Sequence, residues 1–368
     1  MTYLVDFIGE HCGMHYYLDA FKRILESIDG VKVGIVSNYS VDEQPPILLN
    51  QYKGNKLNKM LAAGRNILRL RRFIKNHKND HYIYLTYGNI LDPYFLKIVS
   101  KASHHCIDIH EALAQNEDSN VRLREKLAKV YCGNITDVIS HSSRTDDYLM
   151  QFGFKGNRYE VPHFKYVFPR AYDLTSIPHE LRNAISKDRK NVLFFGNITR
   201  EKGIDILLDA VNNLNDDDAG KINVIVAGKD IDGVYKRVRI RPDRSVSFFT
   251  RHISDDELRF LYDNVDYLAL PYRKTSQSGI LEMAFYFKKP IIASDIPYFR
   301  KMLTQFPSFG YLDGNSSKDF TYALHEILKR NPSDFFNEED YAKYENRKEV
   351  DDFKQHFKAW LSSDNDQT

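Results

Sequence analysis

The segment VDYLALPYRKTSQSGILEMAFYFKKPIIASD, residues 265–295, decides the fold class. It contains a short apolar run, a polar loop, an apolar stretch with helical spacing and a second apolar run. A strand, a helix and another strand in this order form the repeating unit of a parallel α/β sheet. The loop before the helix, residues 275–279, consists of small or polar residues whose backbone amides are open to a ligand.

The same alternation extends along the whole chain. In the first half, the spacing predicts strands at 3–9, 31–37, 81–87, 104–110, 137–142 and 158–163, and helices at 14–28, 56–77, 93–102, 119–132 and 144–152. Residues 165–190 interrupt the rhythm with prolines and scattered charges. The pattern then restarts, with strands at 191–197, 222–228, 246–251, 265–272, 290–295 and 309–313 and helices at 203–214, 254–263, 279–287 and 318–329.

Two doubly wound, Rossmann-like α/β domains follow from this pattern, because 368 residues are too many for one comfortable core. We expect the first domain over 1–165 and the second over 166–345. A last helix, within 346–368, needs a partner for its apolar residues, and we expect it to pack back on the first domain. Ligands of such folds bind beyond the carboxyl ends of the strands, in a cleft between the two sheets.

Composition excludes several classes of protein. The formal net charge is only +2, and the three cysteines, Cys12, Cys106 and Cys132, are scattered without CxxC spacing. These counts argue against a polyanion-binding protein, a disulfide framework and a zinc site. The N-terminus lacks a basic region, and no apolar run approaches the roughly 20 residues that span a bilayer, so we expect a cytoplasmic or peripheral protein. The dinucleotide-binding GxGxxG and the phosphate-binding GxxxxGK[ST] loops are both missing from the sequence.

Two loops at predicted strand ends are candidates for a nucleotide site. At the start of a helix, Ser278 and Gly279 would present amides to an anion, and Glu282 could accept hydrogen bonds from a sugar diol. In GNITREKGIDILLDA, residues 196–210, Lys202 could meet a diphosphate. The simpler interpretation stays open for each: Ser278 caps the helix, Glu282 is a first-turn acid, and Lys202 is a solvated lysine in a turn.

Three blocks in order resemble the donor-binding half of retaining GT-B glycosyltransferases of family 4, the glycosyl transferases of group 1. They are FFGNITREKGIDILLDA, INVIVAGKD and RHISDDELRFLYDNVDYLALPYRKTSQSGILEMAFYFKKPIIASD. In the first half, HCGMHYY after the first strand is similar to the family's acceptor loop, and DIHE, residues 108–111, to a strand that ends in a cleft histidine. The resemblance implies a GT-B fold with an acceptor-binding first domain and a second domain that binds a nucleotide sugar.

The resemblance also implies roles for single residues. Lys202 would neutralise the donor diphosphate, with Arg200 nearby, and Glu282 would hold the ribose. The loop residues Ser276, Gln277, Ser278 and Gly279 would contact the phosphates or the sugar, and Gly13 would let the acceptor loop approach them. His110 would reach the transferred sugar, although a hydrogen-bonded core histidine remains the alternative.

Two positions depart from the family pattern. The family's first glutamate corresponds to Lys274, and its arginine after the strand corresponds to Asn197, which we keep among the donor-binding candidates. Arg200 could replace the missing guanidinium from another turn position. Enzymes of this kind use no bound metal and no cofactor, and we expect none here. Asp230–Asp232 resembles a metal-binding DxD but more simply starts a helix, and Asp216–Asp218 is expected to be a solvated turn.

The segment KGNKLNKMLAAGRNILRLRRFIKNHKN, residues 53–79, is basic, contains no acid and has apolar residues at helical spacing. Either it docks the protein on the anionic inner face of the cell membrane, or it is an outer helix whose apolar stripe is buried in the first domain. Nucleic acid is a poorer partner, because no nucleic-acid module surrounds the segment.

We therefore expect a retaining, metal-independent hexosyltransferase. It would move a sugar from a nucleotide-diphosphate donor to a glycan or lipid-linked acceptor, in polysaccharide or glycolipid assembly. The alternatives are a nucleotide-sugar epimerase of the same fold and a protein that binds nucleotide sugars without catalysis.

Overall fold

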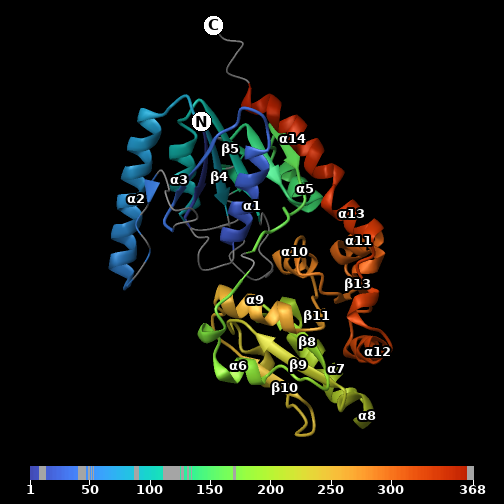
Figure 1. The fold of residues 1–368 in the computed structure, drawn as a ribbon. Helices are drawn as coiled ribbons and strands as arrows, with labels where there is room; N and C mark the ends of the chain where they lie inside the picture. The colour runs from blue at the N-terminus through green and yellow to red at the C-terminus, as the bar shows by residue number, and fades with distance from the viewer. Residues whose placement is uncertain are drawn as a thin grey trace. The chain divides into compact units, whose positions relative to one another are not determined.

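The structure is a computed structural model that describes residues 1–7, 14–39, 47–48, 50, 52, 54–86, 91–110, 125, 128–130, 132–133, 135–168 and 171–362. The chain divides into two compact units. Unit 1 comprises Met1–Tyr166 with Lys348–Thr368, and unit 2 comprises Val167–Arg347. Each unit is an α/β sandwich around a parallel sheet (Figure 1).

The described part of unit 1 contains a seven-stranded sheet in the order β3-β2-β1-β4-β5-β6-β7, and every neighbouring pair is parallel. The strands are β1 (Thr2–Asp6), β2 (Val33–Ser37), β3 (Ile47–Leu48), β4 (His81–Thr86), β5 (His104–Ile109), β6 (Asp137–Ser140) and β7 (Asn157–Glu160). The order runs outward in both directions from β1 and β4, which is the doubly wound arrangement expected from the sequence.

Helices cover the two faces of this sheet. They are α1 (Met14–Glu26), α2 (Lys56–Asn76), α3 (Asp92–Val99), α5 (Ser143–Gln151) and α14 (Lys348–Leu361). One core cluster joins the sheet to α2, α3 and α5, through residues such as Leu70, Phe95 and Leu149. On α1, Phe21 contacts Phe353 of α14, with ring centroids 6.1 Å apart. The last helix therefore packs within unit 1.

Unit 2 repeats the design with a six-stranded sheet in the order β10-β9-β8-β11-β12-β13, parallel throughout in the described residues. The strands are β8 (Lys190–Phe195), β9 (Ile222–Ala227), β10 (Val246–Phe249), β11 (Tyr267–Leu270), β12 (Ile291–Ser294) and β13 (Gly310–Asp313). Strand β8 lies between β9 and β11, so the order reverses at β8, where ligands of open α/β sheets bind.

The helices of unit 2 are α6 (His179–Asn183), α7 (Ile204–Asn213), α8 (Asp216–Ala219), α9 (Asp255–Asn264), α10 (Gly279–Tyr286), α11 (Pro297–Gln305), α12 (Ser317–Leu328) and α13 (Glu338–Glu345). Short 3₁₀ helices lie at η2 (Leu174–Ser176), η3 (Arg200–Lys202), η4 (Val234–Arg237), η5 (Pro307–Phe309) and η6 (Pro332–Asp334). Helices α7 and α12 bury apolar stripes in one core cluster with β8, β9 and β11.

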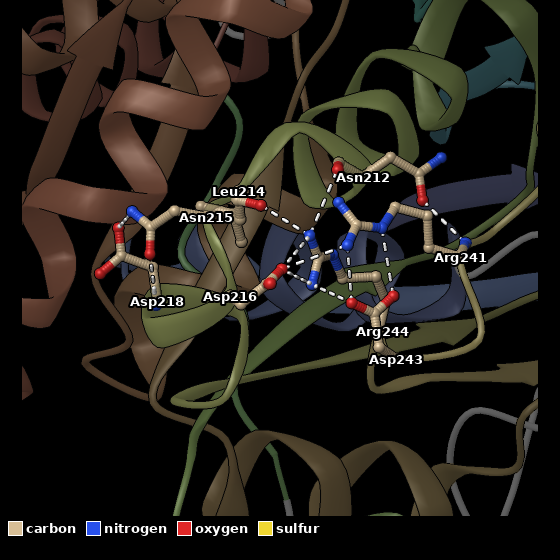
Figure 2. A network of polar contacts seen from close by, with 8 residues as sticks. All are labelled: Asn212, Leu214, Asn215, Asp216, Asp218, Arg241, Asp243 and Arg244. Carbon is tan, nitrogen blue, oxygen red and sulfur yellow. Dashed lines mark hydrogen bonds and ion pairs between the residues drawn. The ribbon is translucent and has the colours of Figure 1, made fainter.

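A polar network ties the connection before β10 to the end of α7 (Figure 2). The buried Arg244 donates to the Leu214 carbonyl over 2.6 Å, and Arg244 and Arg241 share the carboxylates of Asp216 and Asp243 at 2.8–3.4 Å. The predicted turn at Asp216–Asp218 is instead the start of helix α8, which Asn215 caps, although Asp216 and Asp217 are exposed as expected. Asp218 is buried and pairs with His325 at 2.7 Å.

None of the helices in the described residues combines the length and the apolar character that crossing a bilayer requires.

Candidate functional site

The turn after β8 approaches the sheet closely because of its glycines. Gly203 ends η3 in the left-handed conformation, with φ of 66°, and a Cβ there would lie 1.9 Å from the Pro271 carbonyl oxygen. Gly196 has φ of 96°, and a Cβ there would lie 2.7 Å from Lys202 Nζ. The ammonium group of Lys202 therefore folds back over the bare backbone of Gly196, at the carboxyl end of the sheet.

Hydrogen bonds hold the cationic turn of η3 in place. The Arg273 guanidinium donates to the Arg200 carbonyl over 2.7 Å and to the Asp205 carboxylate over 2.7–2.8 Å. The Arg273 amide donates to the Glu201 carbonyl over 2.7 Å. Asp232 accepts from the Arg200 amide over 2.7 Å and from the Val234 amide at the start of η4 over 3.3 Å, so the DID segment supports this turn. Preorganisation of this kind lets a cation meet a ligand without first paying an ordering cost.

Helix α10 begins beside this turn. Ser278 is its N-cap and accepts a hydrogen bond from the Leu281 amide over 3.3 Å, as the simpler interpretation expected. Among the residues that the structure describes, the amides of Gly279 and Ile280 have no acceptor. Such amides lie at the positive end of a helix dipole and bind anions.

The two loops identified in the sequence thus meet at one place. The side chains of Lys202 and Ile280 both reach the α-carbon of Gly196, because a Cβ on Gly196 would lie 2.7 Å from Lys202 Nζ and 3.2 Å from Ile280 Cδ1. The ring of the buried Tyr272 lies 5.6 Å from Lys202 Nζ. One ammonium group and two open amides at the end of a sheet form an arrangement suited to a diphosphate.

The other predicted residues of unit 2 surround this place. Asn197 and Arg200 are exposed, while Ser276, Gln277 and Gly279 are half-buried. The Thr275 hydroxyl donates to the Gln277 carbonyl, which fixes the loop before α10. Tyr272 and Ile280 were missed in the sequence, although both lie inside the quoted segment 265–295, because an aromatic or aliphatic side chain there carries no polar signal.

Glu282 lies in a buried polar environment. Its side chain is 1% exposed, and Arg347 approaches Oε1 at 3.1 Å while the Tyr344 hydroxyl donates to Oε2 over 2.6 Å. Burial, and then Glu282, raise the pKa of Tyr344. Burial alone would lower the pKa of Arg347, but the neighbouring carboxylate of Glu282 raises it. Both carboxylate oxygens are engaged, so the ribose role of Glu282 stays a prediction.

His110 belongs to unit 1, where it directly follows β5 and is 4% exposed. It lies in a buried group with Asp108, His141 and Tyr17, and its ring stacks on His141 with centroids 4.6 Å apart. Burial and then His141 and His163 hold the pKa of His110 well below its usual range, so its imidazole is neutral at pH 7. Gly13 lies outside the described residues. Sequence reasoning missed His141, although it follows β6 as His110 follows β5.

Comparison with known proteins agrees with this fold. The family described as "Glycosyl transferases group 1" matches residues 189–330, which contain β8 to α12 and all the site residues of unit 2 except Arg347 and Tyr344. This match supports the glycosyltransferase interpretation of the chain. No curated protein matches the sequence.

Solved structures of the GT-B fold resemble nearly the whole chain. Anabaena Alr3699/HepE in complex with UDP-glucose has a TM-score of 0.66 at 14% identity, covering 98% of this chain and 99% of that one. Sucrose-phosphate synthase (tll1590) from Thermosynechococcus elongatus has a TM-score of 0.64 at 15% identity, and the alignment covers 98% of this chain and 94% of that one. WaaG, a glycosyltransferase involved in lipopolysaccharide biosynthesis, has a TM-score of 0.63 at 14% identity, and the alignment covers 98% of this chain and 100% of that one. The chain therefore has the GT-B fold.

Proposed function

We propose that the protein is a retaining glycosyltransferase that takes a hexose from a nucleotide-diphosphate donor. The observation that carries the proposal is the position of Lys202, folded over Gly196 beside the open amides of α10. The family match over the same residues supports it. HepE, which shares the fold, is described with UDP-glucose, so UDP and its sugars are the first ligands to test.

In this proposal the diphosphate is bound without a metal or another cofactor. Lys202 and the amides of Gly279 and Ile280 hold the phosphates, and the exposed Arg200 completes the positive charge. Each charge-assisted contact is worth roughly 1.5–3 kcal/mol. Because these donors are fixed before the reaction, they stabilise the charge that develops on the leaving diphosphate as the glycosidic bond breaks.

The acceptor hydroxyl then attacks the anomeric carbon on the face that the diphosphate leaves, and a donor phosphate oxygen takes its proton. We assign no side chain as general base. His110, as a neutral imidazole, would donate to or accept from a hydroxyl of the sugar and so position it.

We further propose that α2 places the enzyme at the inner face of the cell membrane, where a lipid-linked acceptor would be found. Leu57, Met60, Leu61 and Leu68 lie on the helix surface and are 50–63% exposed. The buried residues Ala62, Asn66, Leu70 and Ile74 occupy the opposite side of the helix. The sequence pattern had suggested a single apolar stripe on this helix. In the structure, one face of the helix is buried in the core and another exposes apolar side chains.

Helix α2 also exposes seven basic residues, namely Lys56, Lys59, Arg65, Arg69, Arg71, Arg72 and Lys75. A helix that exposes apolar side chains together with basic ones lies in the plane of an anionic leaflet, with the apolar side chains below the headgroups. A glycan or a glycolipid would be presented to the enzyme at that surface.

Turnover tests the proposal. Purified protein should first show a thermal shift with one nucleoside diphosphate from a panel, and then slowly hydrolyse the corresponding nucleotide sugar in the absence of an acceptor. Release of the sugar with its configuration retained, read by NMR, supports a retaining transferase. Binding without any turnover, even with acceptor extracts, would favour a non-catalytic binding protein, and interconversion of donor sugars would favour an epimerase.

A further inference from the structure

Three histidines meet at the carboxyl edge of the sheet in unit 1. His110 follows β5, His141 follows β6 and His163 lies beyond β7, and their ring centroids are 4.6–5.6 Å apart. All three are at most 8% exposed, and Asp108 of β5 is fully buried beside them. A buried carboxylate among imidazoles needs positive charge for its stability.

Hydrogen-bond geometry locates that charge. His141 Nδ1 lies 2.9 Å from the Val161 carbonyl oxygen, which can only accept, so Nδ1 carries a hydrogen. In a neutral ring, Nε2 then presents a lone pair to Asp108 Oδ1, which is 2.8 Å away and is also an acceptor. The Tyr17 hydroxyl donates to the other oxygen, Oδ2, over 2.5 Å. A proton or a metal ion therefore has to lie between His141 Nε2 and Asp108 Oδ1.

We propose that Asp108, His110 and His141 bind a divalent transition-metal ion, with Zn²⁺ as the best fit. Their ligand atoms lie within 4.8 Å of one another, with His110 Nε2 3.6 Å from Asp108 Oδ1. Metal bonds of about 2.1 Å would span the 2.8 Å and 3.6 Å separations at angles of about 85° and 120°. Two imidazoles and one carboxylate are a donor set that Zn²⁺ and Co²⁺ accept.

The surroundings are those of a metal site rather than of an isolated hydrogen bond. A ligating histidine donates its other ring N–H to a carbonyl, as His141 does to Val161. A ligating carboxylate accepts a hydrogen bond on its second oxygen, as Asp108 does from Tyr17.

A bound ion would change what His110 can do in the transfer reaction. With the metal on its Nε2, His110 would not make the sugar contact proposed above through that nitrogen. The binding claim itself is independent of that proposal, because metal binding can be measured without any donor or acceptor.

The experiment uses the untagged full-length chain, stripped with a chelator and titrated with Co²⁺. We expect one equivalent to give visible d–d absorption that Zn²⁺ abolishes, and Zn²⁺ to raise the melting temperature. Asp108→Asn and His141→Ala should lose both effects, while Tyr17→Phe, which removes only the supporting hydroxyl, should weaken affinity by about ten- to hundredfold. His163→Ala is the matched control, because it removes a ring of the same group that contributes no ligand.

Should Asp108→Asn fail to fold, His110→Ala, which leaves the Asp108–His141 contact in place, replaces it in the titration. No Co²⁺ spectrum with the folded wild-type chain would overturn the proposal and show that a proton occupies the site. Equal Co²⁺ binding by wild type, His110→Ala and His141→Ala would also overturn it, because the ion would then lie elsewhere.

Discussion

At the scale of single residues, Glu282 and Arg347 form a buried ion pair between positions 65 apart in the sequence. The acid is visible in the sequence as the first-turn glutamate of an apolar helix, but nothing local marks Arg347 as its partner. Sequence reasoning could therefore predict that Glu282 is special and could not predict what it contacts. The same limit applies to Asp108 and His141, 33 residues apart, which only the pairing of β5 with β6 brings together.

Glu282→Gln should destabilise the protein, because it leaves the guanidinium of Arg347 buried without a counter-charge. Loss of one member of a buried pair costs about 3–5 kcal/mol in free energy of unfolding. Tyr344→Phe, the control, removes one hydrogen bond to the same carboxylate and should cost about 1 kcal/mol. Urea denaturation at pH 7 measures both.

The double variant Glu282→Gln/Arg347→Met separates charge from packing, since it removes the orphaned cation. It should recover a large part of the stability lost in Glu282→Gln. If Glu282→Gln unfolds with the same free energy as wild type, the ion-pair account is wrong, and a ribose contact becomes the better explanation of Glu282.

Gly203→Ala should also be destabilising, for a backbone reason. The residue has φ of 66°, and the new Cβ would lie 1.9 Å from the Pro271 carbonyl oxygen, so the turn at η3 has to move. We expect a loss of several kcal/mol in free energy of unfolding and weaker nucleotide binding. Gly30→Ala is the control, because its φ is 81° and nothing lies within 4 Å of its Cβ position. Equal stability of the two variants would show that the close contact at Gly203 is unimportant.

At the scale of elements, periodicity predicted most strands and the long helices, and the parallel sheets followed from their alternation. Helices α11 and α13 were missed, although Phe299, Met302 and Leu303 of α11 are buried with helical spacing. No element was predicted just after residue 295, where Pro297 is the first residue of α11. A proline in the first helical turn is compatible with a helix, so it does not mark the end of one. Strand β3 has two residues, too few for any period to show.

Helix α2 gives the element-scale prediction. Wild-type protein should co-sediment with anionic vesicles at low salt and much less with neutral ones. Arg65→Ala/Arg72→Ala removes two exposed charges and should weaken this binding by about 2 kcal/mol, or about thirtyfold, since each basic residue contributes on the order of 1 kcal/mol. Leu61→Ser/Leu68→Ser should also weaken vesicle binding, because it removes apolar surface that would be buried in the bilayer.

Lys236→Ala is the control for the vesicle experiment, because it removes an exposed lysine that belongs to unit 2 and not to α2. Absence of binding to anionic vesicles would remove the membrane proposal. Equal binding by the control and the α2 variants would assign it to another surface.

At the scale of the whole molecule, two doubly wound sheets could be predicted from the rhythm of the sequence. The resemblance of residues 194–295 to known donor-binding halves led to the prediction that the second sheet carries a diphosphate site. The chemistry that distinguishes donors and acceptors could not be predicted, because it depends on side chains brought together by folding. Tyr272 and Ile280 beside Lys202 are examples.

The most direct test of the account is the affinity of Lys202→Ala for the nucleoside diphosphate that wild type binds best, measured by isothermal titration calorimetry. Lys221→Ala is the matched control, because Lys221 precedes β9 at the opposite, amino end of the same sheet. We predict that Lys202→Ala binds about ten- to hundredfold more weakly, from the loss of one charge-assisted contact, and that Lys221→Ala binds like wild type. Equal affinities in all three folded proteins, or no nucleotide binding by wild type, would contradict the account.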